Sequence, residues 1–506
     1  MFEKKKVIII GGGISGLSAG IYAQKNGLEA VIIEKNASIG GFCTGWTRQD
    51  FYLDGCMHWL TGTKEGTVLN RSWKEVGAFS SQEDLYYLNI WGTFEYQGIR
   101  VPFYRDLELA EKTWLEISPI DKKIIHRFFK IVKDIASIEL PLETPTSMIP
   151  FKDILKFGIQ VINIWPSYLL PMKMSVSHFA KKFKSPALRW ALNHAQPGDG
   201  NLFSMAFSYA TIADGNGGVI IGGSKVMAER MKETFISCGG KLMVNSPVSH
   251  VIIENDIAIG VYLKDGTTIS GDYVIAACDP HYAYEKLLNN KYQNYHFNKR
   301  YFTPKRNPSP SCCLLHFAIE DLEDLPIPYS FEIEPIHVGA SNISHLTLRN
   351  YSYDKQTFVK DNKTVVQVLI DQYGNDFDLW NNAHLSKPFY NKLKQIVAEH
   401  VKERIIAKFP QYENKITLLD IATPYTLYRY NNASRGSYMG FLFNKRSNMY
   451  VHNGKVSGLK NFYLSGQWMQ CPGGLPLALS CGKFTIQRIC KKENLKFIFT
   501  RKAIID

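Results

Sequence analysis

The residues best suited to chemistry lie near the start of the chain, in the run Gly11-Gly12-Gly13-Ile14-Ser15-Gly16. In this spacing Gly11 allows a tight turn, Gly13 lets the backbone approach a pyrophosphate, and Gly16 lets a helix pack closely on a strand. Glu34 follows eighteen positions after Gly16. A carboxylate there accepts hydrogen bonds from ribose hydroxyls and repels a 2′-phosphate. The predicted chemistry is therefore the binding of FAD or NAD rather than NADP.

A βαβ unit must position these residues, and the flanking sequence has the pattern of one. Residues 7–10 are short and β-branched like a buried strand, residues 17–26 predict a helix that stops at Gly27, and residues 31–33 predict a second strand. The amino terminus of the helix would then face the phosphate charge. A glycine turn without a ligand is the alternative, and the joint presence of strand, helix, strand and acid disfavours it.

Two later stretches also carry glycines next to predicted strands and helices. The first is glycine-rich at 215–224 and continues into a helical pattern at 225–235. Strands of a β-meander that feeds a buried strand are then predicted at 241–244, 248–254, 258–263, 267–270 and 273–277. The second has a strand entering Gly466, a glycine loop at 472–476, and a helix at 477–490. Another helix amino terminus would thus point at a ligand-sized gap.

The amino-acid composition restricts the kinds of ligand or surface that the protein could bind. The 29 Phe, 27 Tyr and 9 Trp make the chain rich in aromatic residues, which suits an apolar or flat ligand. A net charge of +13 is compatible with nucleic acid, anionic lipid or an acidic substrate. Because no RNA- or DNA-binding signature accompanies it, we expect no nucleic acid and favour an anionic membrane surface, with a simple solvated basic surface equally open.

The cysteines indicate a reducing compartment. There are nine of them, an odd number, and no CxxC pair occurs, so a disulfide framework is not expected. The sequence also has no HExxH or GxSxG motif, and we expect no metal site. No window reaches the roughly 18 apolar residues of a spanning helix. We therefore expect a cytoplasmic protein whose membrane contact, if any, is peripheral and on the inner face.

One segment could make that contact. Residues 151–174 are apolar at helical spacing, carry Lys152, Lys156 and Lys173, include Trp165, and are broken by prolines. A basic amphipathic segment of this kind can lie in a lipid headgroup layer. An ordinary core helix capped by a proline turn is the alternative. The basic tail at 483–506 has the same two interpretations, membrane contact or solvation.

Together these stretches resemble the FAD-dependent phytoene desaturase family, which also includes carotenoid cis-trans isomerases and retinol saturases. Glu34-Lys35 followed by Gly40-Gly41 is similar to the extended flavin motif of that family. Residues 51–59 are similar to its next strand and turn, and Gly466 with 472–476 to its C-terminal flavin loop. Relatives often have Arg after the Gly41 equivalent and an acid at the position of Gln467. Residues 422–424 and 429–438 are similar to a late part of the substrate domain.

The resemblance implies an α/β fold in which a discontinuous Rossmann-type FAD-binding domain is joined to a mixed α+β substrate domain. We expect the FAD-binding domain at 1–70, 215–290 and 455–506, and the substrate and membrane-associating domain at 71–214 and 291–454. The family keeps FAD noncovalent. The residues that the resemblance assigns to FAD are Gly11, Gly13, Ile14, Ser15, Gly16, Glu34, Lys35, Gly41, Met57, His58, Val248, Gly466, Gly473, Gly474 and Leu475.

The leading functional hypothesis is an FAD-dependent oxidoreductase that desaturates or saturates a carbon–carbon bond of a long apolar isoprenoid or polyene, held in an aromatic tunnel. The N5 atom of the flavin would accept or donate the hydride, so the protein itself need only position the substrate and exclude water. A redox-neutral isomerase with reduced FAD, a flavin amine oxidase and a lipid-carrying flavoprotein are the alternatives. Quinone, oxygen, a diffusing reductant or a nicotinamide could exchange the electrons.

No catalytic side chain is identified by the sequence. His58 is the one candidate acid or base, against a structural histidine. Cys471 and Cys481 are either redox thiols or buried inert cysteines. Lys225 would either contact the flavin or the substrate or lie exposed on its helix.

Overall fold

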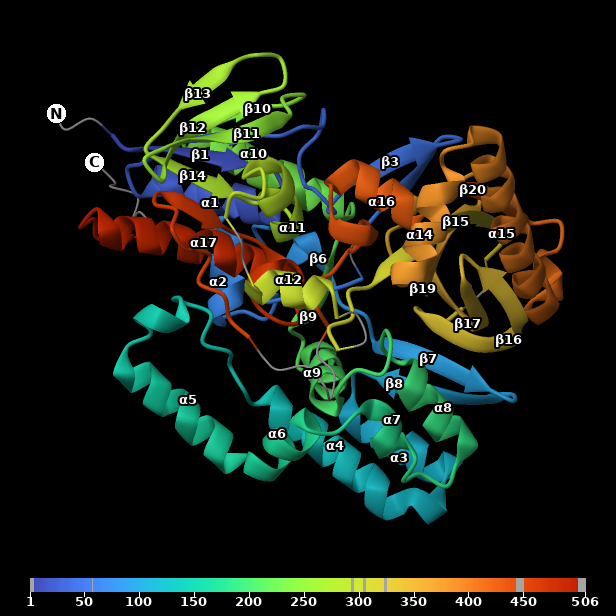
Figure 1. The fold of residues 1–506 in the computed structure, drawn as a ribbon. Helices are drawn as coiled ribbons and strands as arrows, with labels where there is room; N and C mark the ends of the chain where they lie inside the picture. The colour runs from blue at the N-terminus through green and yellow to red at the C-terminus, as the bar shows by residue number, and fades with distance from the viewer. Residues whose placement is uncertain are drawn as a thin grey trace.

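A computed structural model describes residues 4–56, 58–292, 295–303, 306–322, 325–442 and 450–498. The predicted fold class is confirmed, because a parallel sheet with helices and a larger mixed sheet are both present (Figure 1). The parallel sheet has the strand order β10-β2-β1-β14-β21. Its strands are β1 (Lys6–Ile10), β2 (Glu29–Ile33), β10 (Lys241–Met243), β14 (Tyr273–Ala276) and β21 (Phe462–Leu464).

Each face of the parallel sheet is covered by different elements, as alternating side chains require. Val7 and Ile9 of β1 pack in one core cluster with apolar residues of α1 (Ile14–Lys25), α10 (Ser224–Ser237) and α17 (Leu475–Lys492). Ile8 and Ile10 pack in another with β11 and β12. These last two strands belong to a small antiparallel sheet of β11 (Val248–Glu254), β12 (Ile257–Leu263) and β13 (Thr268–Ser270).

The predicted meander is therefore partly wrong. Residues 241–243 form β10, which pairs in parallel with β2 and not with β11. The cause is the helix before it, because α10 returns the chain to the edge of the parallel sheet, whereas β11 to β13 are joined by short turns. At the centre of the sheet, α1 lies so close to β1 that an ideal Cβ on Gly16 would lie 2.0 Å from the Gly11 carbonyl oxygen. Only glycine fits there.

The second large sheet has the order β20-β15-β19-β17-β16-β7-β8, with β18 paired to β19. Core residues on one of its faces, such as Phe317, Leu348 and Val368, pack against Val401 and Ile405 of helix α15. Its strands are β7 (Ile90–Tyr96), β8 (Ile99–Tyr104), β15 (Ser311–Glu320), β16 (Tyr329–Val338), β17 (Ser341–Asn350), β18 (Val359–Lys360), β19 (Lys363–Gln372) and β20 (Ile416–Ala422).

A helical lobe lies below both sheets in Figure 1. Aromatic residues dominate its core, with Trp114, Phe128 and Tyr209 fully buried. Its helices are α3 (Leu107–Ile117), α4 (Lys122–Ala136), α5 (Phe151–Asn163), α6 (Trp165–Met172), α7 (Val176–Ala180), α8 (Pro186–His194) and α9 (Leu202–Ala213). The other α-helices and strands of the described residues are α2 (Val68–Glu75), α11 (Pro280–Tyr282), α12 (Tyr295–Tyr301), α13 (Lys355–Phe358), α14 (Gly374–Ala383), the long α15 (Lys387–Lys408), α16 (Pro424–Asn431), β3 (Gly45–Arg48), β4 (Phe51–Asp54), β5 (Leu60–Thr61), β6 (Leu85–Tyr86) and β9 (Gly217–Ile220).

Helix α5 differs from the rest of the lobe because none of its residues is buried. Phe151 is 79% exposed and Ile162 is 68% exposed. The interpretation of 151–174 as a core helix is thus wrong for α5, most of whose apolar side chains are exposed to solvent. The break falls at Ile164, and Pro166 lies in the first turn of α6 while Pro171 lies inside it. None of the helices described is long and apolar enough to cross a bilayer.

Candidate functional site

One cavity of about 770 Å³ lies between the parallel sheet and the eight-stranded sheet. The carboxyl ends of β1, β2 and β14 open into it, and Gly11, Glu34 and Cys278, which follow these strands, line it. In open α/β sheets, ligands bind at this edge. The other wall comes from the eight-stranded sheet, through residues such as Leu314 and Leu369.

Two helices present their amino termini to the cavity. Gly13 is the N-cap of α1 and Gly474 is the N-cap of α17, and neither end receives a hydrogen bond from a capping side chain. Both glycines line the cavity. The backbone N–H groups of each first turn, together with the helix dipoles, therefore form a cradle for an anionic group.

Glu34 is placed as the motif requires, at the end of β2 and 6% exposed. Its Oε2 accepts a hydrogen bond of 2.8 Å from the Gly12 N–H, and its Oε1 accepts one of 2.8 Å from the Asn36 N–H. These bonds fix the carboxylate at the cavity wall, where each oxygen retains a second lone pair. Lys35 is also at the wall, and its Nζ donates to Asn432 Oδ1 at 2.9 Å.

The structure brings most of the predicted cofactor residues together. The following line the cavity: Gly11, Gly13, Ile14, Ser15, Glu34, Lys35, Gly41, His58, Val248, Gly466, Gly474 and Leu475. Gly16 and Gly473 do not line it. Gly16 packs against Gly11, and an ideal Cβ on Gly473 would lie 2.8 Å from the Gly440 nitrogen, so both serve close backbone packing. Met57 lies outside the described residues.

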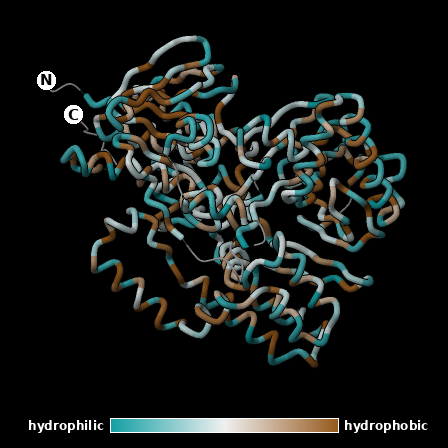
Figure 2. Tube along the Cα trace, viewed as in Figure 1, coloured by the Kyte–Doolittle hydropathy of each residue, from teal (hydrophilic) through white to brown (hydrophobic). Residues whose placement is uncertain are grey.

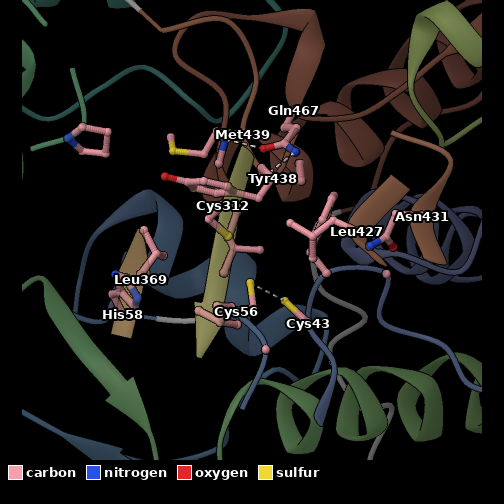
Figure 3. Close-up of a pocket in the computed structure, with 18 of the residues that line it drawn as sticks. Cys43, Cys56, His58, Cys312, Leu369, Leu427, Asn431, Tyr438, Met439 and Gln467 are labelled. Atoms are coloured by element: carbon pink, nitrogen blue, oxygen red, sulfur yellow. Dashed lines mark hydrogen bonds between the residues drawn. The ribbon is translucent and has the colours of Figure 1, made fainter. Parts of the chain in front are cut away.

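The C-terminal loop is tied together by Gln467 (Figure 3). Its Oε1 accepts a hydrogen bond from the Gly474 N–H at 3.0 Å, and its Nε2 donates to the Tyr438 carbonyl oxygen at 3.2 Å. An amide can do both, whereas a carboxylate at this position could only accept. Gln467 therefore joins the start of α17 to the segment that carries Tyr438.

Asp371 of β19 is a cavity residue that the sequence argument missed. Tyr438 Oη donates a hydrogen bond of 3.1 Å to its Oδ1. Burial raises the pKa of Asp371 to about 6, and the tyrosine bond opposes that rise. The signal in the sequence was the spacing of Gln367 and Asp371, two polar residues four positions apart in a strand with an apolar centre, which puts both on one face together with Leu369.

His58 is held as a neutral imidazole. Burial, together with the nearby Arg349 guanidinium, lowers the pKa of His58 to about 3, against an opposing effect of the Gln367 hydrogen bond. Its Nε2 donates to Gln367 Oε1 at 3.2 Å, which leaves Nδ1 as the acceptor atom of the ring. Any proton that His58 exchanged would thus be accepted at Nδ1.

All nine cysteines are free. Cys471 and Cys481 do not line the cavity, and burial raises the pKa of each thiol to about 12, so the redox-thiol interpretation gains no support. Cys43 and Cys56 do line it, with their Sγ atoms 3.9 Å apart (Figure 3). Lys225 is not among the lining residues.

The expected aromatic tunnel is only partly present. Trp59, Trp91 and Phe94 line the cavity, but the other large aromatic side chains of the helical lobe pack in its core. Polar residues take many of the remaining wall positions, among them Asn193, Gln196, Ser204, Ser208, Ser330, His345, Thr347 and Arg349.

Comparison with known proteins gives relatives that span nearly the whole chain. Residues 9–76 match the family described as NAD(P)-binding Rossmann-like domain. The chain is 23% identical to a 4,4′-diapophytoene desaturase (4,4′-diapolycopene-forming) from Methylomonas sp, over 98% of this chain and 97% of the relative. It is also 23% identical to a chloroplastic prolycopene isomerase from Daucus carota, over 85% and 71% of the two chains. A solved oxidoreductase from Methanosarcina mazei shares the fold, with a TM-score of 0.60, 14% identity, and coverage of 95% of this chain and 100% of that one.

Proposed function

With the resemblance to the FAD-dependent phytoene desaturase family confirmed along nearly the whole chain, we propose that the protein is an FAD-dependent oxidoreductase. Its substrate would be a long apolar isoprenoid or polyene in which a carbon–carbon bond is desaturated or saturated. The observation that supports this proposal most directly is that one cavity is lined both by the glycine turn at Gly11 and Gly13 and by a face of the eight-stranded sheet. When bound, FAD would supply a hydride acceptor or donor at its N5 atom.

The residues around the amino termini of α1 and α17 have the chemistry that FAD requires. The open N–H groups after Gly13 would hold the pyrophosphate, Glu34 the ribose, and the backbone at Val248 the adenine. Gly466, Gly474 and Leu475 would lie along the flavin, with the N-terminus of α17 directed toward it. The domain boundaries expected from the sequence, 1–70, 215–290 and 455–506, assign all these contacts to one domain.

Adding or removing two hydrogens at a carbon–carbon bond takes one hydride and one proton. We propose that Asp371 donates or accepts the proton. Its carboxyl lines the cavity and has a pKa of about 6, so both protonation states are accessible near neutral pH. In the saturating direction Asp371 would give the proton to carbon, and in the desaturating direction it would take it. Tyr438 Oη holds the carboxyl oxygen Oδ1 in place.

A redox-neutral cis-trans isomerase is the second candidate, and the carrot prolycopene isomerase among the relatives favours it. The same cavity would serve, because isomerisation also needs a polyene placed against a redox ring in a water-poor site. The electron partner of an oxidoreductase would be unnecessary for this reaction.

Anaerobic stopped-flow spectroscopy tests the proposal, with 4,4′-diapophytoene and all-trans-retinoate as a hydrocarbon and a polar-ended polyene. We expect the purified protein to be yellow and its flavin to respond. Bleaching of oxidised flavin indicates desaturation, reoxidation of reduced flavin indicates saturation, and an isomerised product without net electron change indicates isomerisation. A colourless protein that takes up no added FAD would contradict the assignment.

We further propose that α5 docks the protein on an anionic membrane surface. Brown and teal segments alternate along this helix in Figure 2, as in an amphipathic helix. Its exposed apolar side chains, with the adjoining Trp165, are Phe151, Ile154, Leu155, Ile159, Ile162 and Trp165. Lys152 and Lys156 are exposed beside them and would reach headgroup phosphates while the apolar face enters the acyl boundary.

Vesicle sedimentation tests the docking. We expect the protein to bind phosphatidylglycerol-containing vesicles and the double substitution Ile154→Glu, Ile162→Glu to weaken binding by at least about 10-fold, because each glutamate removes buried apolar area and adds repulsion. Ile120→Glu is the matched control, since Ile120 is 77% exposed but lies outside α5. Equal binding of the double variant and the control would exclude α5 as the docking element.

A further inference from the structure

The wall of the cavity opposite the glycine cradle is a sheet face with an unusual composition. On β17, Leu346 and Leu348 point into the core, whereas His345, Thr347 and Arg349 line the cavity. Arg349 is paired in register with Gln367 of β19, another cavity residue. An apolar hydrocarbon alone would not need a cationic and hydrogen-bonding wall, because every unmatched polar group there costs free energy when water is displaced.

Arg349 is the strongest feature of that wall. It is 4% exposed, and its one hydrogen bond among the described residues runs from Nη2 to the His58 carbonyl oxygen at 2.5 Å. Its Nε is buried without a partner. Within the part of the chain that the structure describes, no Asp or Glu lies within ion-pair distance of the guanidinium. A buried guanidinium always carries its charge, so it calls for an anion.

Several polar side chains that line the cavity together with Arg349 are uncharged. Burial lowers the pKa of His345 to about 4, so its imidazole is neutral at physiological pH. Thr347 Oγ1 and Ser330 Oγ form a hydrogen bond of 2.7 Å with one another. The cavity residue Gln196 has a buried Nε2 without a partner. Arg349 therefore shares the cavity with neutral hydrogen-bonding side chains and with apolar ones such as Leu88, Trp91 and Phe94.

We propose that this wall is a subsite for a carboxylate at one end of an otherwise apolar substrate. The guanidinium still has an unpartnered Nε, and the planar fork of arginine suits the two oxygens of a carboxylate. The inference deepens the proposed function and rests on it, because it takes the cavity as the substrate site. It narrows the substrate class from a hydrocarbon polyene to an isoprenoid or polyene acid.

Ligand binding to the flavin-loaded protein tests the proposal without turnover. The probes are all-trans-retinoate and all-trans-retinol, which share the polyene and differ in the terminal group, and the readout is quenching of Trp59 and Trp91 fluorescence. We expect the carboxylate to bind about 10- to 100-fold more tightly than the alcohol, as a charge-assisted hydrogen bond provides. Arg349→Gln should remove this preference and leave alcohol binding within about threefold of its original value.

Arg349→Lys is the second variant, which keeps the positive charge but lacks the paired N–H donors of the planar guanidinium. It should retain part of the preference, which also protects the test if Arg349→Gln fails to fold. Equal affinity of the wild-type protein for the two probes would overturn the proposal. So would an Arg349→Gln protein that loses flavin absorbance but keeps the preference, because the guanidinium would then serve the cofactor. Failure of the wild-type protein to hold flavin would instead contradict the proposed function.

Discussion

Gly13→Asp is expected to give a protein that is folded, at least as stable as the original, and colourless. An ideal Cβ on Gly13 meets no atom closer than the Gly41 Cα at 3.9 Å, and the backbone φ of −73° suits any residue. An aspartate at this N-cap would accept the first-turn N–H groups of α1, which stabilises a helix by roughly a few tenths of a kcal/mol relative to glycine. The same carboxylate would take the place of the pyrophosphate and repel it, so FAD affinity should fall by at least about 100-fold.

Two measurements check this result: flavin released per polypeptide, and thermal denaturation of the apoprotein. Gly98→Asp is the matched control. Gly98 lies in the turn between β7 and β8 and has no atom within 4 Å of an ideal Cβ. Its φ is positive, which aspartate adopts more readily than most residues but at a cost in stability, so this variant controls for flavin content and not for thermal stability. A Gly13→Asp protein with a full complement of flavin would refute the assignment of the cradle.

Asp371→Asn is expected to lower turnover by about 10²- to 10⁴-fold, the usual contribution of a positioned acid or base, while flavin content stays unchanged. The amide keeps the size of the side chain and can still accept the bond from Tyr438 Oη, so the cavity should keep its shape. Single-turnover flavin reduction or reoxidation with a bound polyene is the appropriate measurement. A loss smaller than about threefold would show that another group handles the proton.

The pH dependence of the same reaction reports its direction. Saturation needs protonated Asp371, so its rate should be full below the pKa and fall as pH rises through about 6. Desaturation needs the carboxylate, so its rate should rise through the same midpoint. Tyr438→Phe removes a donor that stabilises the carboxylate and should move the midpoint upward in either case. An unmoved midpoint would mean that Asp371 does not set the profile.

The sequence predicted the glycine-rich wall of the cavity far better than the wall formed by the eight-stranded sheet. The glycine spacing at 11–16 and the acid at Glu34 are local signals, because turn, helix start and strand end are all encoded within one βαβ unit. The placement of β10 was missed because it depends on the edge of the sheet to which the preceding helix returns the chain. The sequence of a short apolar strand does not indicate with which neighbouring strand it pairs.

Arg349 and Asp371 could not be assigned for a different reason. In a strand such as β17, the alternation of side chains identifies two faces, but it does not say which face meets a core, a cavity or water. That is decided by α15 packing on one side of the sheet. The same limit applies to α5, whose amphipathic pattern was readable while the absence of a packing partner was not.

The order of elements in the parallel sheet has a consequence for biosynthesis. Strand β21 and helix α17 come late in the chain, yet they complete the sheet beside β14, pack on α1 through Ser18 Oγ and the Leu479 carbonyl oxygen, and supply Gly466, Gly474 and Leu475 to the cavity. The complete cavity therefore forms only after most of the polypeptide has left the ribosome. Under the proposed function, flavin would bind the complete site after translation, and the share of flavin-loaded molecules would follow the cellular supply of flavin through mass action.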